Sequence, residues 1–376
     1  MPVNILYSCI GGTSGYAEAA KNYVLTLAET CNVCYLDDLP DCAAGFPDEG
    51  RLWKRLEQLR TPLDHYDVLI MHYMPDAWNN CYEKHKHYRF KKVIGITVWE
   101  TDWLNPKWVD YCNYSWLDEV WVPVEWNKTT FIKSGVKTDI RIVPHIYMDE
   151  GSSVFDEGDA REVMLSSIAA NNFVYYTIGQ WNERKGITET IQAFCNTYTS
   201  ADKVCLVVKT FCEDYSAYDG AKCRFMLHNL LKKFSKPPRV ALITDNFPRK
   251  YMELMHRSFN CFLSLCKSEG WGLGAFEAAA HGNKVIITGY GGQLEFLPAE
   301  YCSFISHRNE KVKNMDHLYW LRGQYWASPD IDDAVSKIKK MRLADKKKNA
   351  GLSKHIRMNF GQDAITKVMN KSFENI

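Results

Sequence analysis

Residues 268–286 read SEGWGLGAFEAAAHGNKVI, and this stretch decides the fold of the second half of the chain. It follows a short apolar run, opens with glycines, continues with helix-forming residues and stops at Gly282, a residue type that commonly ends helices. We therefore expect a strand, a glycine-rich turn and a helix in succession. The first turn of this helix exposes backbone N–H groups and the positive end of the helix dipole around Gly272, Leu273 and Gly274, which favours a bound anion.

Two carboxylates accompany this turn. Glu269 precedes the helix, and Glu277 lies about one turn inside it, roughly 6 Å from the exposed amides. A diphosphate at the amides would leave one carboxylate free to accept hydrogen bonds from ribose hydroxyls and the other from sugar hydroxyls. The alternative interpretation is a glycine-rich turn with two incidental glutamates.

The stretch resembles the signature of the retaining GT-B glycosyltransferases called GT4, in which two glutamates are separated by seven residues in E-G-[FW]-G-L-x-x-x-E-A-x-A-x-G-x-x-V-I. Glu269 and Glu277 fit that spacing. The resemblance implies that Glu269 contacts the donor sugar, that Glu277 holds the nucleotide ribose, and that the amides of residues 272–274 meet the phosphates. The stretches TGYGGQLEFL (288–297) and WASPD (326–330) resemble segments of a branch of the same transferases.

A second segment, TIGQWNERKG (177–186), resembles the family's strand-loop G-R-x-x-x-x-K-G, whose basic residues neutralise the diphosphate leaving group. Gly179 and Lys185 match the pattern. Gln180 stands where arginine is common, so the second phosphate contact is either supplied by Arg184 or missing, in which case Arg184 is a solvated surface residue.

Lys209 is a further donor-binding candidate. It ends the apolar run 204–209, and charged residues at the carboxyl ends of parallel strands face the ligand crevice. The alternative is a surface lysine that extends its amine into solvent.

In the N-terminal half, the loop GGTSG around Gly12 stands where the family has a glycine-rich loop facing the phosphates and the acceptor. It lacks the G-x-G-x-x-G spacing of a dinucleotide site. The stretch GITVWETD (95–102) ends an expected strand, and we expect Glu100 and Asp102 to be the polar groups nearest the reacting centre. The alternative is that they are buried, hydrogen-bonded structural residues. Many members of the resembled family carry a histidine near the position of Glu100, whereas this chain does not. His72 is the second candidate for a residue near the reacting centre.

A chain of 376 residues exceeds one ordinary core, and short apolar runs alternate with helical segments, as in parallel sheets built from βαβ units. The resemblance implies an α/β GT-B fold, with two Rossmann-like doubly wound domains facing a central cleft. We expect domains at 1–160 and 161–345, and C-terminal helices at 346–376 that cross back to the first domain. The expected strands are 4–10, 32–36, 68–73, 93–99, 119–124, 140–143, 174–178, 204–209, 240–244, 261–265, 284–288 and 303–305.

Composition narrows the choice of partners. A net charge of +1 provides no strong positive field that would hold nucleic acid, so we expect no nucleic-acid partner. The thirteen cysteines are scattered, several of them within apolar runs, which indicates reduced thiols. The N-terminus lacks a basic leader and no apolar run approaches 20 residues, so we expect a cytoplasmic protein. A basic run between Lys337 and Lys354 predicts a solvated helix face or, less simply, peripheral contact with anionic lipid.

The resemblance implies transfer of a hexose from a GDP- or UDP-sugar to a carbohydrate acceptor with retention. Lys185 and helix amides would stabilise the leaving diphosphate, and no D-x-D follows a strand, so neither a cofactor nor a metal is expected. The rival interpretations are a sugar-nucleotide epimerase or phosphorylase on the same fold, a nucleotide-dependent oxidoreductase, and a catalytically silent carbohydrate-binding protein. The paired glutamates disfavour the first, and the missing dinucleotide fingerprint disfavours the second.

Overall fold

The computed structural model describes residues 2–39, 51–149, 151, 155–170, 172–313, 323–342, 346–374 and 376. The chain divides into two compact units. The first comprises Met1–Gly151 with Arg357–Ile376, and the second Ser152–Ile356. The sequence had suggested boundaries at 160 and 345.

The first unit is built around a six-stranded sheet in the order β2-β1-β3-β4-β5-β6, in which every neighbouring pair is parallel. Its strands are β1 (Asn4–Ile10), β2 (Asn32–Leu39), β3 (Val68–His72), β4 (Lys92–Ile96), β5 (Glu119–Val122) and β6 (Asp139–Ile142). Its helices are α1 (Gly15–Leu27), α2 (Arg51–Gln58), α3 (Trp78–His85), α4 (Pro106–Cys112), α5 (Glu125–Ser134) and α13 (Gln362–Asn370), with 3-10 turns η1 (Pro75–Ala77), η2 (Lys86–Tyr88) and η4 (Lys371–Phe373).

The second unit contains a second six-stranded parallel sheet, in the order β12-β11-β10-β7-β8-β9. Its strands are β7 (Phe173–Gln180), β8 (Val204–Phe211), β9 (Arg239–Ile243), β10 (Cys261–Ser264), β11 (Lys284–Thr288) and β12 (Ser303–Ile305), and an antiparallel pair joins β13 (His307–Lys311) to β14 (Tyr325–Pro329). Its helices are α6 (Ala160–Ala170), α7 (Ile187–Thr197), α8 (Ala217–Leu231), α9 (Arg249–Ser258), α10 (Leu273–Ala280) and α11 (Ile331–Arg342), with the 3-10 turn η3 (Gly292–Glu295). Helix α12 (Ala350–Phe360) contains the boundary between the units.

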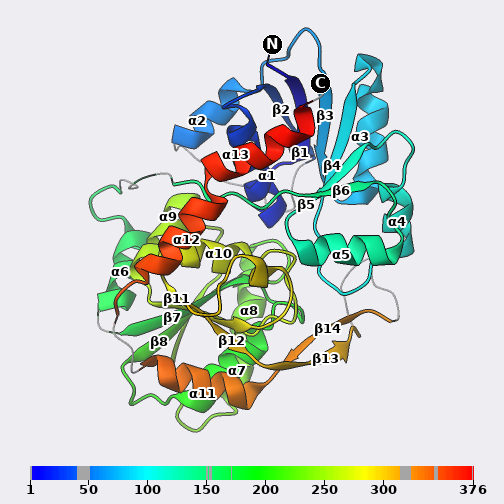
Figure 1. The fold of residues 1–376 in the computed structure, drawn as a ribbon. Coiled ribbons are helices and arrows are strands. Elements are labelled where there is room, and N and C mark those ends of the chain that lie inside the picture. Colours follow the sequence, from blue (N-terminus) through cyan, green and yellow to red (C-terminus); the bar gives the residue numbers. More distant parts are fainter. Residues whose placement is uncertain are drawn as a thin grey trace. The chain divides into compact units, whose positions relative to one another are not determined.

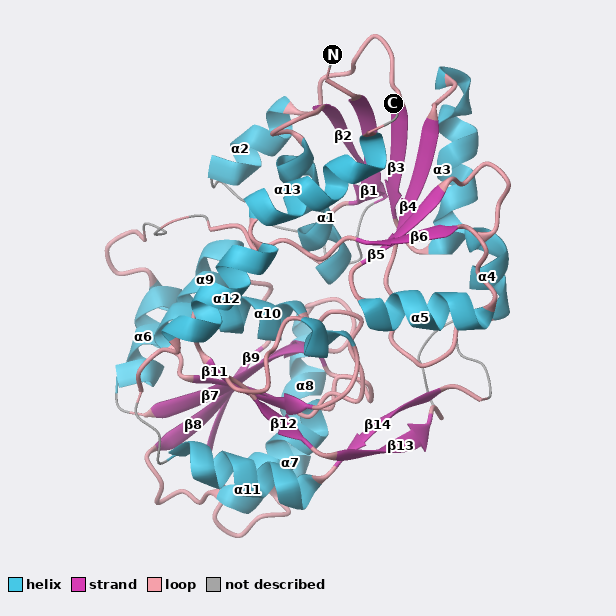
Figure 2. Cartoon of the chain, viewed as in Figure 1, coloured by secondary structure: helices cyan, strands magenta, loops and turns pink. Residues whose placement is uncertain are grey.

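Both sheets carry helices on their faces, as Figures 1 and 2 show for each unit. This arrangement explains why the central strands read as continuous apolar runs, since strands covered on both faces bury every side chain. In β3, for example, all five residues are buried. The expected α/β architecture of two Rossmann-like, doubly wound sheets is confirmed.

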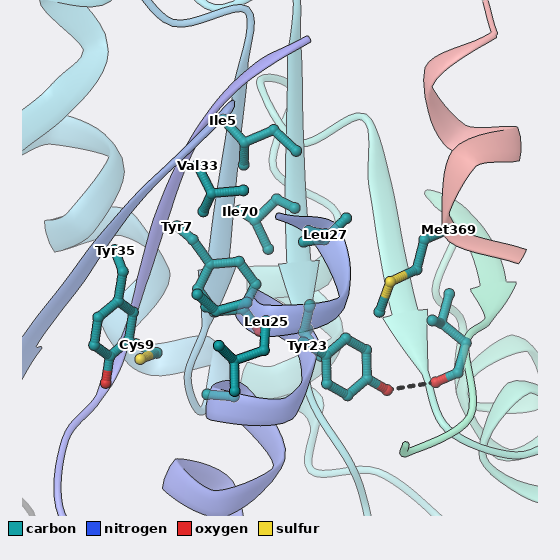
Figure 3. Close-up of a cluster of buried hydrophobic side chains, with 14 of the residues drawn as sticks. Ile5, Tyr7, Cys9, Tyr23, Leu25, Leu27, Val33, Tyr35, Ile70 and Met369 are labelled. Atoms are coloured by element: carbon teal, nitrogen blue, oxygen red, sulfur yellow. Dashed lines mark hydrogen bonds between the residues drawn. The ribbon is translucent and has the colours of Figure 1, made fainter. Parts of the chain in front are cut away.

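The end of the chain belongs to the core of the first unit. Helix α13 packs against α1, and its Met369 lies in the same buried cluster as Ile5 of β1 and Ile70 of β3 (Figure 3). The Tyr23 hydroxyl of α1 donates to the carbonyl of Val143 at 2.6 Å in this cluster. The first core is therefore completed by residues that follow the whole second unit in sequence.

Candidate active site

The second sheet has a topological switch point between β7 and β10. The chain leaves β7 toward β8 and later returns to β10, on the other side of β7. Loops that leave two such strands diverge, and ligands of open α/β sheets usually bind at the carboxyl ends of these strands. Here the loop after β7 carries Arg184 and Lys185, and the loop after β10 carries Glu269. Three candidate residues are thus gathered at one edge of one sheet.

Glu269 is a buried carboxylate held by two cations. The Lys185 Nζ donates to both of its oxygens, at 2.7 and 2.8 Å, and the Arg184 guanidinium donates to Oε2 at 3.1 Å. Arg184 also donates to the carbonyl of Ser268 at 3.0 Å. Burial alone would raise the pKa of Glu269, but the charges of Lys185 and Arg184 outweigh burial and hold that pKa below its usual value. The carboxylate is therefore ionised at neutral pH.

The glycine that follows Lys185 in this loop is required for steric reasons. Gly186 has φ +59°, and a Cβ there would lie 2.0 Å from the carbonyl oxygen of Leu265, just after β10. Only glycine permits this approach. The Arg184 carbonyl accepts from the Lys267 amide at 2.7 Å, and the Lys185 amide donates to the Asn182 side chain at 3.0 Å. These contacts hold the backbone of residues 184–186 against the segment that follows β10.

Gln180 does not take up the position of a second cation beside Glu269. Its side-chain amide donates to the carbonyl of Cys212 at 2.6 Å, and its side-chain oxygen accepts from Asn182 at 3.1 Å. Arg184 instead lies against Glu269 with its side chain only 15% exposed, so the alternative of a solvated arginine is wrong. The loop thus presents two cations, although the position where arginine is common carries glutamine.

Helix α10 begins at the expected glycines. Gly272 is the residue before its first turn and has φ +95°, a left-handed conformation that favours glycine. A Cβ on Gly274 would lie 3.1 Å from the Phe262 ring, so this position is also tight. No side chain caps this helix start. The first-turn amides, including that of Leu273, lie beside the Glu269 loop, as the sequence predicted.

The stretch that contains Gly291 and Gly292 packs its backbone against that of Glu269 and Gly270. A Cβ on Gly292 would lie 2.0 Å from the carbonyl oxygen of Gly270, and a Cβ on Gly291 would lie 2.7 Å from that of Glu269. The Gly292 amide donates to the Glu269 carbonyl at 2.7 Å. The resemblance of this stretch to the family therefore has a physical basis in backbone-to-backbone packing.

Glu277, on α10, forms a separate contact. Its Oε2 lies 3.2 Å from Nε2 of His256, a residue of α9 that is 1% exposed. Burial opposes ionisation of Glu277, yet the contact with His256 and neighbouring positive charge hold its pKa below the usual value. His256 lies outside both motifs, so no pattern in the sequence pointed to it.

The protonated nitrogen of His256 follows from its partners. Asn283 donates from its side-chain amide to the hydroxyl of Tyr176 at 2.6 Å, which leaves the hydroxyl hydrogen for Nδ1 of His256, 2.8 Å away. Nδ1 is then an acceptor, and Nε2 carries the hydrogen that points at Glu277. A buried chain of three side chains therefore orients the Glu277 carboxylate.

Lys209 lies in a different environment from the one expected. It is inside β8, which continues to Phe211, and it is 3% exposed, so the surface-lysine alternative is wrong. Its Nζ lies 4.4 Å from the ring centre of Tyr215 and 5.8 Å from that of Phe247. Burial lowers the pKa of Lys209 to about 7.

The basic run near the C-terminus does not form one solvated face. Lys348 donates to the carbonyls of His256 and Phe259 at 3.0 and 2.8 Å, and burial lowers its pKa to about 8. Lys346 donates to the Asn172 carbonyl at 2.8 Å. Part of this run is therefore used for internal contacts.

The candidates of the N-terminal half all belong to the first unit. Gly12 has φ +95° in the loop after β1, and Glu100 and Asp102 are half-buried in the loop after β4. Strand β4 ends at Ile96, so it is three residues shorter at this end than the expected strand 93–99, and Glu100 lies four residues beyond it. The chain turns because the Trp99 indole donates back to the Trp103 carbonyl at 2.8 Å.

His72 ends β3 at the corresponding switch point of the first sheet, where β1 lies between β2 and β3. It is 1% exposed, and its Nδ1 lies 2.7 Å from the Tyr7 hydroxyl. Tyr23 packs edge-on against it, with ring centres 5.5 Å apart. Burial lowers the pKa of His72 well below its ordinary value, so the ring is neutral at pH 7.

Within the described ranges, no group of three or more His, Cys, Asp or Glu residues is placed to hold a metal ion. None of the helices in the described part of the chain is both long and apolar enough to cross a bilayer.

Comparison with known proteins identifies the fold. No protein-family profile and no curated protein sequence matches the chain. Solved structures do match along its whole length. HepE from Anabaena in complex with UDP-glucose superimposes with a TM-score of 0.64 and 14% identity, covering 99% of this chain and 100% of HepE.

Two synthases give a similar result. Sucrose-phosphate synthase from Thermosynechococcus elongatus has a TM-score of 0.68 and 14% identity, with 99% and 98% of the two chains covered. A UDP-forming α,α-trehalose-phosphate synthase from Burkholderia xenovorans has a TM-score of 0.62 and 11% identity, with 100% and 99% covered. The chain therefore has the two-domain, Rossmann-like GT-B fold of these glycosyltransferases.

Proposed function

We propose that the protein is a retaining glycosyltransferase of the GT4 type, which moves a hexose from a nucleotide-diphosphate sugar to a carbohydrate acceptor. The observation that carries this proposal is the ionised Glu269, paired with Lys185 and Arg184 beside the open first turn of α10. Two cations and a row of unpaired amides suit a diphosphate, and a carboxylate among them suits sugar hydroxyls.

Donor binding would exchange partners within this group. The diphosphate takes the Lys185 ammonium and the first-turn amides of α10, and Glu269 then accepts hydrogen bonds from hydroxyls of the donor sugar. Glu277, oriented by His256, accepts from the ribose hydroxyls. Gly179 and Gly12 allow the backbone to approach the ligand, and Lys209 is a further residue of the donor site.

The reaction breaks the bond between the anomeric carbon and the diphosphate oxygen and forms one from the same carbon to the oxygen of an acceptor hydroxyl, which loses its proton. The diphosphate departs with an added negative charge. Lys185, Arg184 and the helix amides stabilise that charge as it grows, so this proposal requires no metal ion. Glu100 and Asp102 would act near the acceptor or near the positive charge that develops at the anomeric carbon.

We infer a uridine donor in preference to a guanosine one. HepE was solved with UDP-glucose and with UDP and glucose, and a trehalose-phosphate synthase of the same fold is UDP-forming. A thermal-shift series with UDP, GDP and ADP tests this choice, because a ligand stabilises the folded state in proportion to RT ln(1 + [L]/Kd).

A catalytically silent nucleotide-sugar binder is the second candidate. Gln180 favours it, since that side chain is turned toward Cys212 where a transferase of this type commonly has arginine. Release of nucleotide diphosphate, measured with UDP-glucose and a panel of mono- and oligosaccharides, separates the two. Release that rises severalfold with one acceptor supports transfer, whereas tight UDP-sugar binding with no release for any acceptor supports the binder.

A further inference from the structure

Helix α8 has an apolar inner face and an unusual outer face. Cys223, Leu227 and Leu230 point into the core of the second unit. On the outside, Tyr218 is 81% exposed and Phe225 67% exposed. They are seven residues apart, which places them on one stripe of the helix about 10 Å apart. With about 200 Å² per ring, they present roughly 300 Å² of aromatic surface to solvent.

The charged residues around this stripe are mostly cations. From α8 to the start of β9 the exposed ones are Lys222, Arg224, Lys232, Lys233, Lys236 and Arg239. Between β8 and β9 the acidic side chains are Asp219, which is buried and accepts the Cys212 and Glu213 amides, and the exposed Glu213 and Asp214. Asp202, from the turn before β8, lies near Lys236, since the Ser200 amide donates to the Lys236 carbonyl at 3.2 Å. Glu213 pairs with Lys222 at 2.6 Å. The two exposed rings of α8 are therefore followed along the chain by a surplus of exposed positive charge that begins where the helix ends.

We propose that the outer face of α8, defined by Tyr218, Phe225 and the exposed cations from Lys222 to Arg239, docks on an anionic lipid surface. Aromatic rings partition into the interfacial region of a bilayer, and lysine and arginine extend their charged ends toward lipid phosphates. Both rings project from the solvent-exposed side of α8. The fluid interfacial region of a bilayer can surround such isolated side chains. A tight protein partner would instead need a shaped pocket around each ring.

The charge also argues against a second copy of this chain as the occupant. In a two-fold symmetric pair, α8 of one copy meets the same patch of the other, and the basic surfaces would repel each other. The basic run near the C-terminus is a weaker candidate for lipid contact, because Lys346 and Lys348 donate to backbone carbonyls within the second unit.

Vesicle co-sedimentation of the full chain tests the proposal. The vesicles are phosphatidylcholine alone, or phosphatidylcholine with about one-third phosphatidylglycerol. The variants are the double substitutions Tyr218→Ser with Phe225→Ser, and Lys232→Glu with Lys233→Glu. The matched control is Val163→Ser with Met164→Ser, which removes exposed apolar side chains from α6 of the same unit. Thermal melts verify that each variant is folded.

We expect binding to the anionic vesicles only, weakened by raising the salt from about 0.1 M to about 1 M. Each α8 variant should lose at least about tenfold in affinity, and the α6 control should bind like the parent protein. Three results overturn the proposal. The first is no binding of the parent protein to anionic vesicles. The second is vesicle binding that the ring substitutions leave unchanged. The third is equally tight, ring-independent binding to soluble polyglutamate, which would indicate an acidic macromolecule as the partner. These outcomes do not depend on whether the protein transfers sugar.

Discussion

Replacing Lys185 by alanine tests the central ion pair and the proposed chemistry together. Lys185→Ala removes both short contacts to Glu269, at 2.7 and 2.8 Å, and leaves the longer Arg184 contact at 3.1 Å. Breaking a buried ion pair completely costs about 3–5 kcal/mol, because the remaining charge has no partner. Because Arg184 still contacts Glu269 in this variant, we expect a smaller loss of folding free energy, about 2 kcal/mol, which is typical of one charge-assisted hydrogen bond.

This magnitude is measurable as stability. For a domain of about 200 residues, 1 kcal/mol shifts Tm by about 2–4 °C, so the second unit should melt about 4–8 °C lower. Glu269→Gln with Lys185→Ala should cost about 2 kcal/mol less than the sum of the two single changes, because each single change already breaks the same interaction. Additive losses would show that the pair contributes nothing as a pair.

The activity assay follows release of nucleotide diphosphate, at a temperature well below the lower Tm. If Lys185 stabilises charge that grows on the leaving group, Lys185→Ala should lower kcat/KM by about 10²-fold, with weaker donor binding as well. A kcat/KM within about twofold of the parent value, well under the tenfold that 1.4 kcal/mol represents, would refute the phosphate role. Lys185→Arg is the control, since it keeps the charge.

Four other outcomes are expected. Glu277→Gln should weaken UDP binding about tenfold in calorimetry with a smaller change in kcat, and His256→Ala should reproduce part of that loss; unchanged binding in both would remove the ribose contact. Lys209 has its pKa lowered to about 7 by burial, so between that pH and about 10.4 the unfolded state binds more protons and stability rises with pH, by up to about 1.4 kcal/mol per unit. Urea unfolding at several pH values should show this slope, and Lys209→Met should abolish it; equal slopes would place Lys209 in solvent. Activity should survive EDTA, and a complete loss that Mn²⁺ restores would contradict the metal-free mechanism. Finally, Glu100→Gln should lower kcat about 10²-fold with donor Kd unchanged, and NMR should show a product that keeps the donor's anomeric configuration; an inverted product would exclude the retaining assignment.

Most of the fold was predictable from local pattern. All twelve expected strands are present within a few residues, because a strand buried on both faces must be a short apolar run between polar segments. The hairpin of β13 and β14 was missed. Strand β13 reads HRNEK, which carries no apolar alternation, and its partner lies more than ten residues later. Its pairing depends on tertiary contacts, such as the Ala327 amide donating to the Lys267 carbonyl at 2.9 Å.

The candidate site was predictable where a motif fixes the backbone. Gly186 and Gly292 occupy positions where a Cβ would collide with a backbone carbonyl, and Gly272 has a positive φ. The glycines of these stretches are therefore required by the backbone geometry. The partners of the charged groups were not predictable. His256 reaches Glu277 from another helix, and one of the two rings beside Lys209, that of Phe247, lies far from it in sequence. Such contacts follow from packing between elements, which periodicity does not encode.

The geometry of Glu269 connects these local details to the proposed chemistry. Its carboxylate keeps Lys185 and Arg184 together, because two half-buried cations with no anion between them would repel each other. A diphosphate supplies a second anion to the same cations, and Glu269 can release Lys185 only if sugar hydroxyls donate to the freed oxygens. A nucleotide diphosphate alone lacks the hydroxyls of the transferred sugar and has only those of its ribose, whereas the intact donor offers several at the Glu269 position. The ion pair between Glu269 and Lys185 would therefore favour the nucleotide sugar over the bare nucleotide. Its exchange of partners would couple donor recognition to the positive charge that departure of the leaving group requires.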